Sequence, residues 1–376
     1  MEHLFFKFNE LTKSLTPKKW RNSENASVVS GREAAEAMAK SAKKKDLIIH
    51  GSGSINLDDS ENFVSSFSKR GEKGTNQDCC IVWEEFGCQK DMIFCGVFDG
   101  HGPWGHFVAK KVRKSMPTAL LCNWQDALVQ TALQPNLELN SGKSHLQFNI
   151  WKHSYIEACA TIDLELERHR KIDTFHSGTT ALSIVRQGDM IVIANTGDSR
   201  AVMATTSDDG NSVPLPIQLT VDFKPNLPQE AERIAQCNGR VFCLPDEPGT
   251  PRIWLPNRAA PGLSMSRSFG DFCVKHFGLI SMPDVTQRTV TSKDLFVVLA
   301  TDGIWDVVLN QEAVQIVHST TDRAKSARRL VEYATRAWKR RRPGIAMDDM
   351  SVIVLFLHFS PLHQQAYVVA PMEKEA

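Results

Sequence analysis

Residues 93–102 read Ile93-Phe94-Cys95-Gly96-Val97-Phe98-Asp99-Gly100-His101-Gly102. A short run that is rich in Ile, Val and Phe predicts a buried β-strand. An acid directly after such a strand is held on a rigid scaffold, yet it emerges at the end of the sheet. The glycine that follows lets backbone carbonyls and solvent approach closely. The stretch therefore predicts a sheet end whose carboxylate, Asp99, is available for chemistry.

The same order of strand, acid and glycine occurs again where the predicted strand Leu295–Thr301 precedes Asp302 and Gly303. Other predicted strands also carry acids at or near their ends, namely Asp78, Asp198, Asp348 and Asp349. Asp-Gly commonly marks a plain turn between strands, so a single occurrence would be weak evidence for a site. Two occurrences, together with the further acids, favour a functional interpretation.

Acids at several strand ends, without a Cys or His cluster, indicate a site for hard cations such as Mg²⁺ or Mn²⁺. Gathered carboxylates would repel one another and raise one another's pKa values, and bound cations remove that cost. Two such ions a few ångströms apart can bind a phosphate and generate a hydroxide nucleophile. The pattern therefore predicts a site for hard cations of a kind that suits phosphate chemistry.

The composition narrows the class of protein. The chain has 376 residues, 44 Lys and Arg against 43 Asp and Glu, and 42% hydrophobic residues. This balance argues against a disordered chain and against a dedicated nucleic-acid binder, which needs an excess of basic residues. We therefore expect a globular protein with a large core and no nucleic-acid partner.

The sequence also indicates the cellular compartment in which we expect the protein. It has no run of about 18 apolar residues, so we expect no membrane span. The first residues are too mixed for a signal peptide, and residue 2 is Glu2, which excludes N-myristoylation. Nine cysteines without metal-site spacing fit a reducing compartment. We expect a cytoplasmic or nuclear protein that is not secreted.

The chain divides into a basic N-terminal extension, a central domain and a short tail. Residues 1–58 are expected to be mobile, with a short helix at Gly31–Ala42. Further strands are predicted at Cys80–Trp83, Met92–Phe98, Thr179–Val185, Met190–Asn195 and Ser351–Phe359. Helices are predicted at Trp151–His169, Pro228–Asn238 and Ala327–Trp338. The Pro-rich connection 241–260 is typical of a flap over a site. Together the elements indicate one α/β or α+β domain.

Seven stretches carry a resemblance to a known family. They are Lys73–Asp78, Val97–Gly102, Ser177–Ala181, Asn195–Arg200, Leu263–Asp271, Leu299–Asp306 and Asp348–Ser351. In this order they resemble the metal-dependent type 2C Ser/Thr protein phosphatases, and within them the plant branch. The resemblance spans about residues 62 to 359. It implies an α+β fold, a four-layer αββα sandwich of two antiparallel sheets flanked by helices. The implied catalytic domain is 59–360, with a flap at about 221–285 and a tail at 361–376.

The resemblance also implies a role for individual residues. By it, Asp99 bridges two Mg²⁺ or Mn²⁺ ions, Gly100 offers its carbonyl, and Asp302 and Asp348 are the remaining direct ligands. Asp78 would hold metal-bound water, His101 would protonate the leaving oxygen, and Asp198 and Asp306 are candidates for a weaker third metal site.

Two positions depart from the family pattern. Lys73 stands where the family has a phosphate-binding arginine, and an ammonium lacks the bidentate fork of a guanidinium. Arg70 lies close in sequence and could substitute for it. Gln77 replaces the acid that usually precedes Asp78, which weakens the negative charge around the metals. Neither change removes a direct ligand, so we expect catalysis to survive.

The resulting hypothesis is a protein serine/threonine phosphatase in which a metal-bound hydroxide at a binuclear centre attacks phosphoserine or phosphothreonine. The expected partners are phosphorylated proteins and protein kinases, and we expect a monomer. One alternative is a catalytically weak or silent scaffold of the same fold that binds phosphoproteins, and another is a hydrolase of small phosphate esters. The basic run 339–342 fits a nuclear signal, a dock for acidic peptides or a helix C-terminus. Trp254, in the flap, is expected to be structural.

Overall fold

The computed structural model describes residues 46–49, 63–132, 143–206 and 213–358. The predicted helix at 31–42 and the tail at 361–376 lie outside the described residues. So does the basic extension 1–58, except for strand β1 (Asp46–Ile49).

Two β-sheets form the centre of the molecule. The first has the order β1, β3 (Cys79–Glu84), β4 (Met92–Phe98), β7 (Ala181–Gln187), β8 (Met190–Thr196) and β15 (Asp284–Thr289). The second has the order β10 (Leu215–Gln218), β9 (Arg200–Thr205), β16 (Asp294–Ala300), β17 (Met350–Phe356) and β2 (Val64–Lys69). Neighbouring strands are antiparallel, except that β1 pairs with β3 in parallel.

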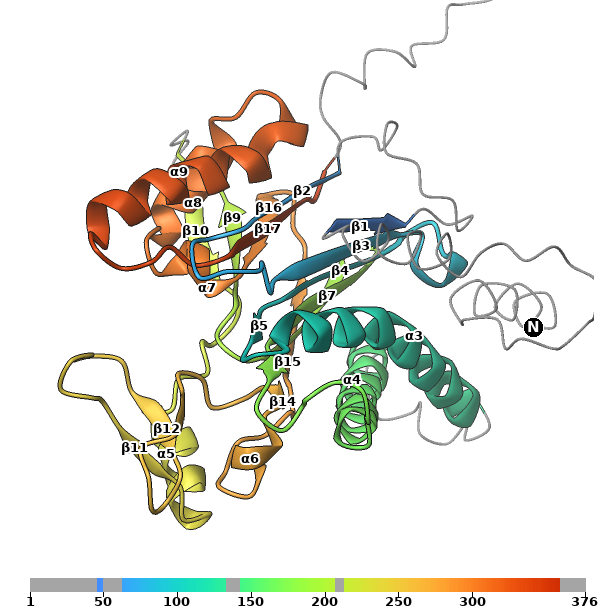
Figure 1. The fold of residues 1–376 in the computed structure, drawn as a ribbon. Coiled ribbons are helices and arrows are strands. Elements are labelled where there is room, and N and C mark those ends of the chain that lie inside the picture. Colours follow the sequence, from blue (N-terminus) through green and yellow to red (C-terminus); the bar gives the residue numbers. More distant parts are fainter. Residues whose placement is uncertain (1–45, 50–62, 133–142, 207–212, 359–376) are drawn as a thin grey trace, which may run out of the picture.

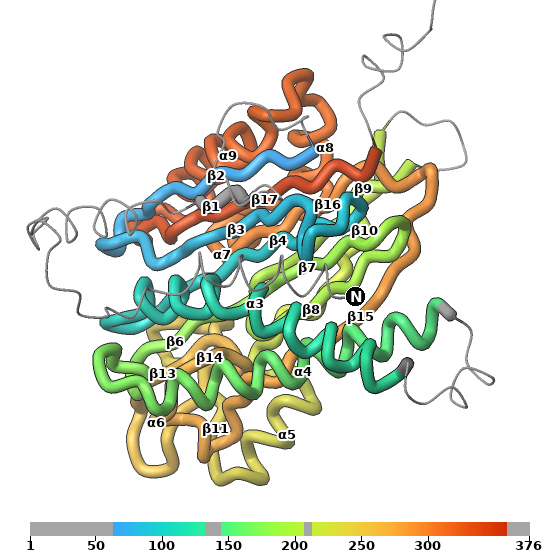
Figure 2. The backbone as a smooth tube through the Cα atoms, turned by 90° about the vertical axis from the view of Figure 1, so that its right-hand side faces the viewer, coloured from blue at the N-terminus to red at the C-terminus, as the bar shows by residue number. Residues whose placement is uncertain are grey.

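Helices cover the outer face of each sheet (Figure 1). The first sheet is covered by α3 (Gly105–Ala132) and α4 (Lys143–Glu167), and the second by α8 (Asn310–His318) and α9 (Ser326–Arg341). Short helical turns are η1 (Phe86–Cys88), α7 (Asp302–Trp305) and η3 (Arg323–Lys325). Figure 2 shows the layers edge-on, with both sheets between the helix pairs. The predicted αββα sandwich is confirmed.

Alternation along the strands divides the core into layers. In β4, Phe94 and Phe98 pack under α3 and α4, whereas Cys95 and Val97 point between the two sheets. Cys79 and Cys80 face opposite sides for the same reason. Because both faces of these strands are buried, they read in the sequence as continuous apolar runs.

The region 221–285 forms a small subdomain beside the sandwich. It contains α5 (Pro228–Gln236), a sheet of β11 (Arg240–Phe242), β12 (Arg252–Trp254) and β13 (Pro261–Leu263), then β14 (Phe269–Gly270) and α6 (Phe272–Lys275). Its own apolar core consists of Ile234, Ile253, Val274 and Leu279. Trp254 is buried, stacks on Phe242, and donates a hydrogen bond from Nε1 to the Phe242 carbonyl at 2.9 Å. This packing agrees with a structural role for Trp254.

The structure refines two of the predicted elements. The helix predicted at Trp151–His169 begins at Lys143 and ends at Glu167. The strand predicted at Thr179–Val185 is split into β6 (Gly178–Thr179) and β7. β6 pairs with β14 and with β5 (Gly100–His101), so a third sheet links the subdomain to the stretch after Asp99.

Candidate metal centre

The predicted ligands lie at one end of the sandwich because the strands that carry them end there. Asp99 follows β4, Asp302 opens α7 directly after β16, and Asp348 precedes β17. β16 and β17 are paired, and the Thr301 N–H donates to the Ser351 carbonyl at 3.1 Å. The Asp302 turn and the start of β17 are therefore fixed against each other.

The carboxylates lie near enough to one another to raise one another's pKa values. Burial raises the pKa of Asp99 well above its usual value, and repulsion from Asp78, Asp302 and Asp348 raises it further. The pKa of Asp302 is raised in the same way, by burial and then by Asp198 and Asp348. Such mutual repulsion is the arrangement that bound cations relieve.

Asp78 is buried behind this group. Its Oδ2 accepts a hydrogen bond from the Thr301 hydroxyl at 2.8 Å, while its Oδ1 is buried without a partner. Burial, followed by repulsion from Asp349, raises the pKa of Asp78 to about 7. An unpartnered buried carboxylate oxygen is costly unless something binds it, so Oδ1 is suited to accept a hydrogen bond from a metal-bound water.

Two neighbouring acids near β17 have different surroundings. Asp348 forms an ion pair with Lys73, whose side chain is 54% exposed. Asp349 accepts hydrogen bonds from the backbone N–H groups of Gly71 and Gln77, both at 2.7 Å. Asp349 thus fastens the loop that carries Lys73.

Gln77 and Gly100 pack together beneath this loop. The Gln77 side-chain amide donates to the Gly102 carbonyl at 2.9 Å, which supports the turn after Asp99. A Cβ on Gly100 would lie 2.7 Å from the Gln77 carbonyl oxygen and 2.5 Å from that of Gly105. This position therefore requires glycine.

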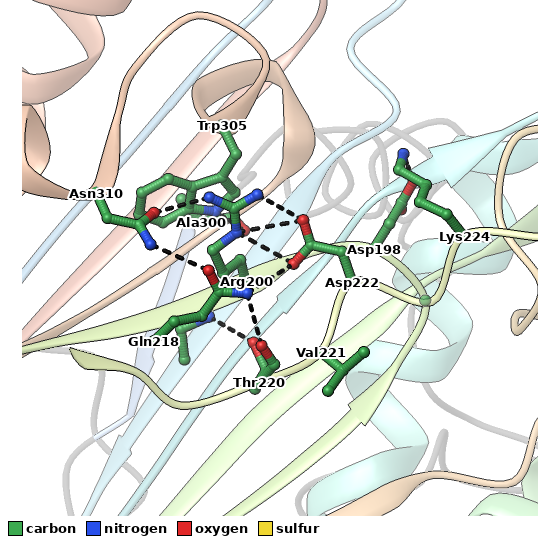
Figure 3. Close-up of polar contacts among 12 residues, drawn as sticks. Asp198, Arg200, Gln218, Thr220, Val221, Asp222, Lys224, Ala300, Trp305 and Asn310 are labelled. Carbon is green, nitrogen blue, oxygen red and sulfur yellow. Dashed lines mark hydrogen bonds and ion pairs between the residues drawn. The ribbon is translucent and has the colours of Figure 1, made fainter. Parts of the chain in front are cut away.

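Asp198 is also buried, and its partner is a lysine that the sequence did not reveal. Lys224 forms an ion pair with Asp198 Oδ2, whereas Asp198 Oδ1 is buried without a partner. Burial alone would lower the pKa of Lys224, but attraction to Asp198 and Asp302 outweighs it and raises that pKa. Figure 3 shows the lysine beside Asp198.

An arginine network fixes the segment that carries this lysine (Figure 3). The Arg200 guanidinium binds both carboxylate oxygens of Asp222, with its shortest contact at 2.5 Å, and donates to Asn310 Oδ1 at 2.7 Å. The guanidinium also lies 5.1 Å from the ring centre of Trp305. Because Arg200 is two residues from Asp198 and Asp222 is two residues from Lys224, the network holds the Asp198–Lys224 pair in place.

Asp306 lies further out. It is exposed, and its Oδ2 is 4.0 Å from an Arg342 nitrogen. Burial and repulsion from Asp198 and Asp348 raise its pKa, against the opposing effect of Lys224 and Arg342.

His101 is paired with a carboxylate from the flap side. Its Nε2 lies 2.6 Å from Asp271 Oδ2, and Asp271 also accepts a hydrogen bond from the Ser268 hydroxyl at 2.7 Å. Burial would lower the pKa of His101, but attraction and hydrogen bonding to Asp271 raise it. Asp271 lies within a stretch that the sequence analysis singled out, but the sequence did not assign it a role.

The donor set fits hard cations. Its members offer oxygen atoms, and two of the buried carboxylate oxygens have no partner. Among the described residues, no three His, Cys, Asp or Glu side chains already converge around one point. Lys73 and Lys224 instead offset the negative charge. The carboxylates would have to close on an ion as it binds.

Comparisons with known proteins agree with this geometry. A family model described as protein phosphatase 2C matches residues 62–340. The chain is 60% identical over 361 residues to probable protein phosphatase 2C 73 of Arabidopsis thaliana, covering 96% of each chain. It is 56% identical over 319 residues to probable protein phosphatase 2C 48 of Oryza sativa, covering 84% of this chain and 89% of that relative.

Solved structures share the fold at lower identity. A serine-threonine phosphatase 2C from Toxoplasma gondii matches with a TM-score of 0.68 and 23% identity, over 78% of this chain and 94% of that one. A C. elegans sex determining protein matches with a TM-score of 0.60 and 19% identity, over 91% of this chain and 77% of that one.

Proposed function

We propose a role for each residue of the acidic site from the premise that the chain belongs to the protein phosphatase 2C family, which the family model and the plant relatives establish. The protein is accordingly a metal-dependent protein serine/threonine phosphatase. Its substrates are phosphorylated proteins. The surroundings of each side chain then suggest how it contributes to hydrolysis.

Asp99, the Gly100 carbonyl, Asp302 and Asp348 would hold two Mg²⁺ or Mn²⁺ ions. Bound there, the ions would neutralise charge on the phosphate and lower the pKa of a coordinated water. The raised pKa values of Asp99 and Asp302 support this assignment, because burial and neighbouring carboxylates disfavour their charged forms until a cation binds. Asp78 would orient that water through its unpartnered Oδ1, and Gln77 would support the turn through Gly102.

His101 would protonate the leaving seryl or threonyl oxygen. Asp271 accepts from Nε2 and favours the charged imidazolium, so the ring can carry a second proton on Nδ1. No group among the described residues accepts a hydrogen bond from Nδ1. The protonated imidazolium would supply the proton that the leaving oxygen takes.

Lys73 would bind the substrate phosphate. Its ammonium is paired with Asp348, which is also a proposed ligand. When Asp348 turns to a cation, Lys73 loses this partner and becomes available to a phosphate oxygen. Ion binding and phosphate binding would thereby be coupled through one carboxylate.

Asp198 and Asp306 would form a third and weaker metal site. The Lys224 ammonium already neutralises Asp198, so an ion at this position would compete with a tethered cation. The structure offers no observation that favours the inactive scaffold.

The compartment, the oligomeric state and the protein kinase partners are proposed on the sequence alone. No helix among the described residues is long and apolar enough to cross a membrane. We propose a cytoplasmic or nuclear monomer that meets phosphoproteins and protein kinases there.

The observation that carries the mechanism is the placement of Asp99, Asp302 and Asp348 directly after β4, directly after β16 and just before β17. The test measures phosphate release from a phosphothreonine peptide with Mn²⁺, with Mg²⁺ and with a chelator. Asp99→Asn should abolish turnover, whereas Asp189→Asn, an exposed acid in the turn between β7 and β8, should leave it unchanged. Turnover that survives the chelator, or that survives Asp99→Asn, would refute the two-metal site.

A further inference from the structure

A group of exposed cations lies at the C-terminal end of α9 and on the loop after β2. Together they form what we call the basic rim, which consists of Arg70, Arg336, Lys339, Arg340 and Arg342. Cations in the last turn of a helix favour its dipole, and this accounts for some of them. It does not account for Arg70, which is outside the helix, or for Arg336, which precedes the last turn.

The end of α9 is fastened directly to the acidic site. The Trp338 Nε1–H donates to the Gly303 carbonyl at 2.7 Å, one residue from Asp302. Arg342 lies 4.0 Å from Asp306. The basic rim therefore borders the metal centre.

The loop after β2 brings Arg70 to the same border. Lys69 donates to the Thr335 hydroxyl at 2.9 Å, which ties the end of β2 to α9. Lys339 and Arg342 follow Thr335 by four and seven residues, so they share the helix face that Thr335 turns toward β2. Figure 1 shows the end of α9, the loop after β2 and α7 near one another.

Most of the rim is available to a ligand. Arg70, Arg336, Lys339 and Arg340 have neither a hydrogen bond nor an ion pair from their side chains within the part of the chain that the structure describes. Arg341 differs, because its guanidinium binds Glu312 at 2.6 and 2.8 Å and the Val307 carbonyl at 2.6 Å.

Few acids offset the rim. Glu72 accepts a hydrogen bond from the Met347 N–H, and Glu332 is exposed one turn before Arg336. Asp306 faces Arg342. Five cations against these three acids leave the rim itself positive, beside the acids of the metal centre, although the chain as a whole carries a net charge of only +1.

We propose that the basic rim binds anionic groups that flank the target phosphate, so that the preferred substrates are phosphoproteins with nearby carboxylates or a second phosphate. This inference rests on the proposed phosphatase activity. Each exposed ion pair contributes little to binding. A positive border beside the reacting site nevertheless raises the encounter rate with acidic substrates, and that gain is lost at high salt.

The test compares two double variants. The rim variant combines Lys339→Gln with Arg340→Gln, and the control variant combines Lys114→Gln with Lys152→Gln. The control removes the same charge from exposed positions on α3 and α4. The substrates are three phosphothreonine peptides, with Glu flanks, with a second phosphoserine, or with Gln flanks, and p-nitrophenyl phosphate. The rim variant should lower kcat/KM about tenfold on the Glu-flanked and doubly phosphorylated peptides at low salt. It should change the Gln-flanked peptide and p-nitrophenyl phosphate less than about twofold, and salt should erase the difference.

Several outcomes would overturn the inference. An equal loss on all peptides, or an equal loss in the control variant, would show that the rim does not read substrate charge. The inference would also fail if the rim variant kept its peptide kinetics but no longer bound DNA or anionic vesicles. That result would assign the rim to another partner. Thermal unfolding of each variant checks that it is folded. Failure of the phosphatase itself would look different, because the wild-type protein would then hydrolyse none of the peptides.

Discussion

Single residues determine how the negative charge of this site is balanced. The sequence did not predict the ion pairs of two of them, Lys73 and Lys224. Lys73 was expected to bind phosphate, yet in the structure it neutralises Asp348. Lys224 was not expected at all, because no short motif announces a lysine that approaches a buried acid from a loop 26 residues away. Both lysines lower the cost of gathering acids before any ion binds.

Lys73 can be tested by restoring the family's arginine. Lys73→Arg should lower KM for a phosphothreonine peptide several-fold with little change in kcat, because a guanidinium binds two phosphate oxygens at once. Steady-state kinetics at saturating Mn²⁺ measures this. Arg70→Lys is the matched exchange at the neighbouring cation and should leave KM unchanged. If Arg70→Lys raised KM and Lys73→Arg did nothing, Arg70 would be the phosphate ligand.

Asp271 can be tested through the pH dependence of catalysis. A general acid must be protonated, so activity falls as pH rises through the pKa of His101. Asp271 raises that pKa, and Asp271→Asn should therefore move the alkaline limb of the kcat profile to lower pH. His101→Gln should remove the limb. A limb that stays in place in Asp271→Asn would mean that another group donates the proton.

At the scale of elements, the strands that the sequence predicts are buried on both faces, and several that it misses lie at sheet edges. The interior strand β9 is an exception, because it is buried on both faces and was not predicted. β4, β8, β16 and β17 are covered on both sides and appear as continuous apolar runs. β2, β10 and β15 lie near or at sheet edges and mix polar with apolar residues, so the sequence did not reveal them. The long helix α3 was missed too, because Pro117 within it and Gly105 at its start argue locally against a helix.

The flap subdomain depends on one buried acid. Glu230 of α5 binds Arg233 and Arg267 with contacts of 2.7–2.8 Å and accepts a hydrogen bond from Ser266 at 2.5 Å. Burial opposes its ionisation, but these hydrogen bonds outweigh burial and lower the pKa of Glu230 to about 2. The acid thus joins α5 to the strand-like segment at 266–268, near Asp271.

Glu230→Gln should lower the free energy of unfolding at pH 7 by about 3–5 kcal/mol, because it leaves two arginines without their buried partner. The folded pKa lies below the unfolded value of 4.5, so this stabilisation is present above pH 4.5 and is lost as pH falls toward 2. Urea unfolding from pH 7 to pH 3 should show the gap to wild type narrowing. The exposed Glu232→Gln on the same helix is the control and should show no gap. A gap that does not depend on pH would point to lost packing rather than lost charge.

Across the whole molecule, local patterns predicted one α/β or α+β domain with acids at strand ends, and the family resemblance predicted the αββα sandwich. The sequence could not predict which side chain pairs with each acid when no metal is bound. The pairs Asp348 with Lys73, Asp198 with Lys224 and His101 with Asp271 join residues between 26 and 275 positions apart. Such contacts depend on how sheets and loops close in space. The sequence also gave no reason to connect Arg70 with the end of α9, which only the packing of β2 reveals.

Because this packing gathers acids at one end of the sandwich, the stability of the whole molecule should depend on metal and pH together. The folded pKa of Asp78, about 7, lies above its unfolded value of 3.8. Its contribution is therefore fully present below pH 3.8 and is lost as pH rises through 7, so metal-free protein should lose stability between about pH 4 and pH 7. Saturating Mg²⁺ should flatten this dependence, because binding to the folded state offsets the repulsion. Thermal unfolding with and without a chelator measures both effects, and in the chelator Asp78→Asn should unfold at a higher temperature than wild type at pH 8. A metal-free protein whose stability does not fall across this range would mean that these carboxylates do not repel one another, and the argument for the metal centre would fail with it.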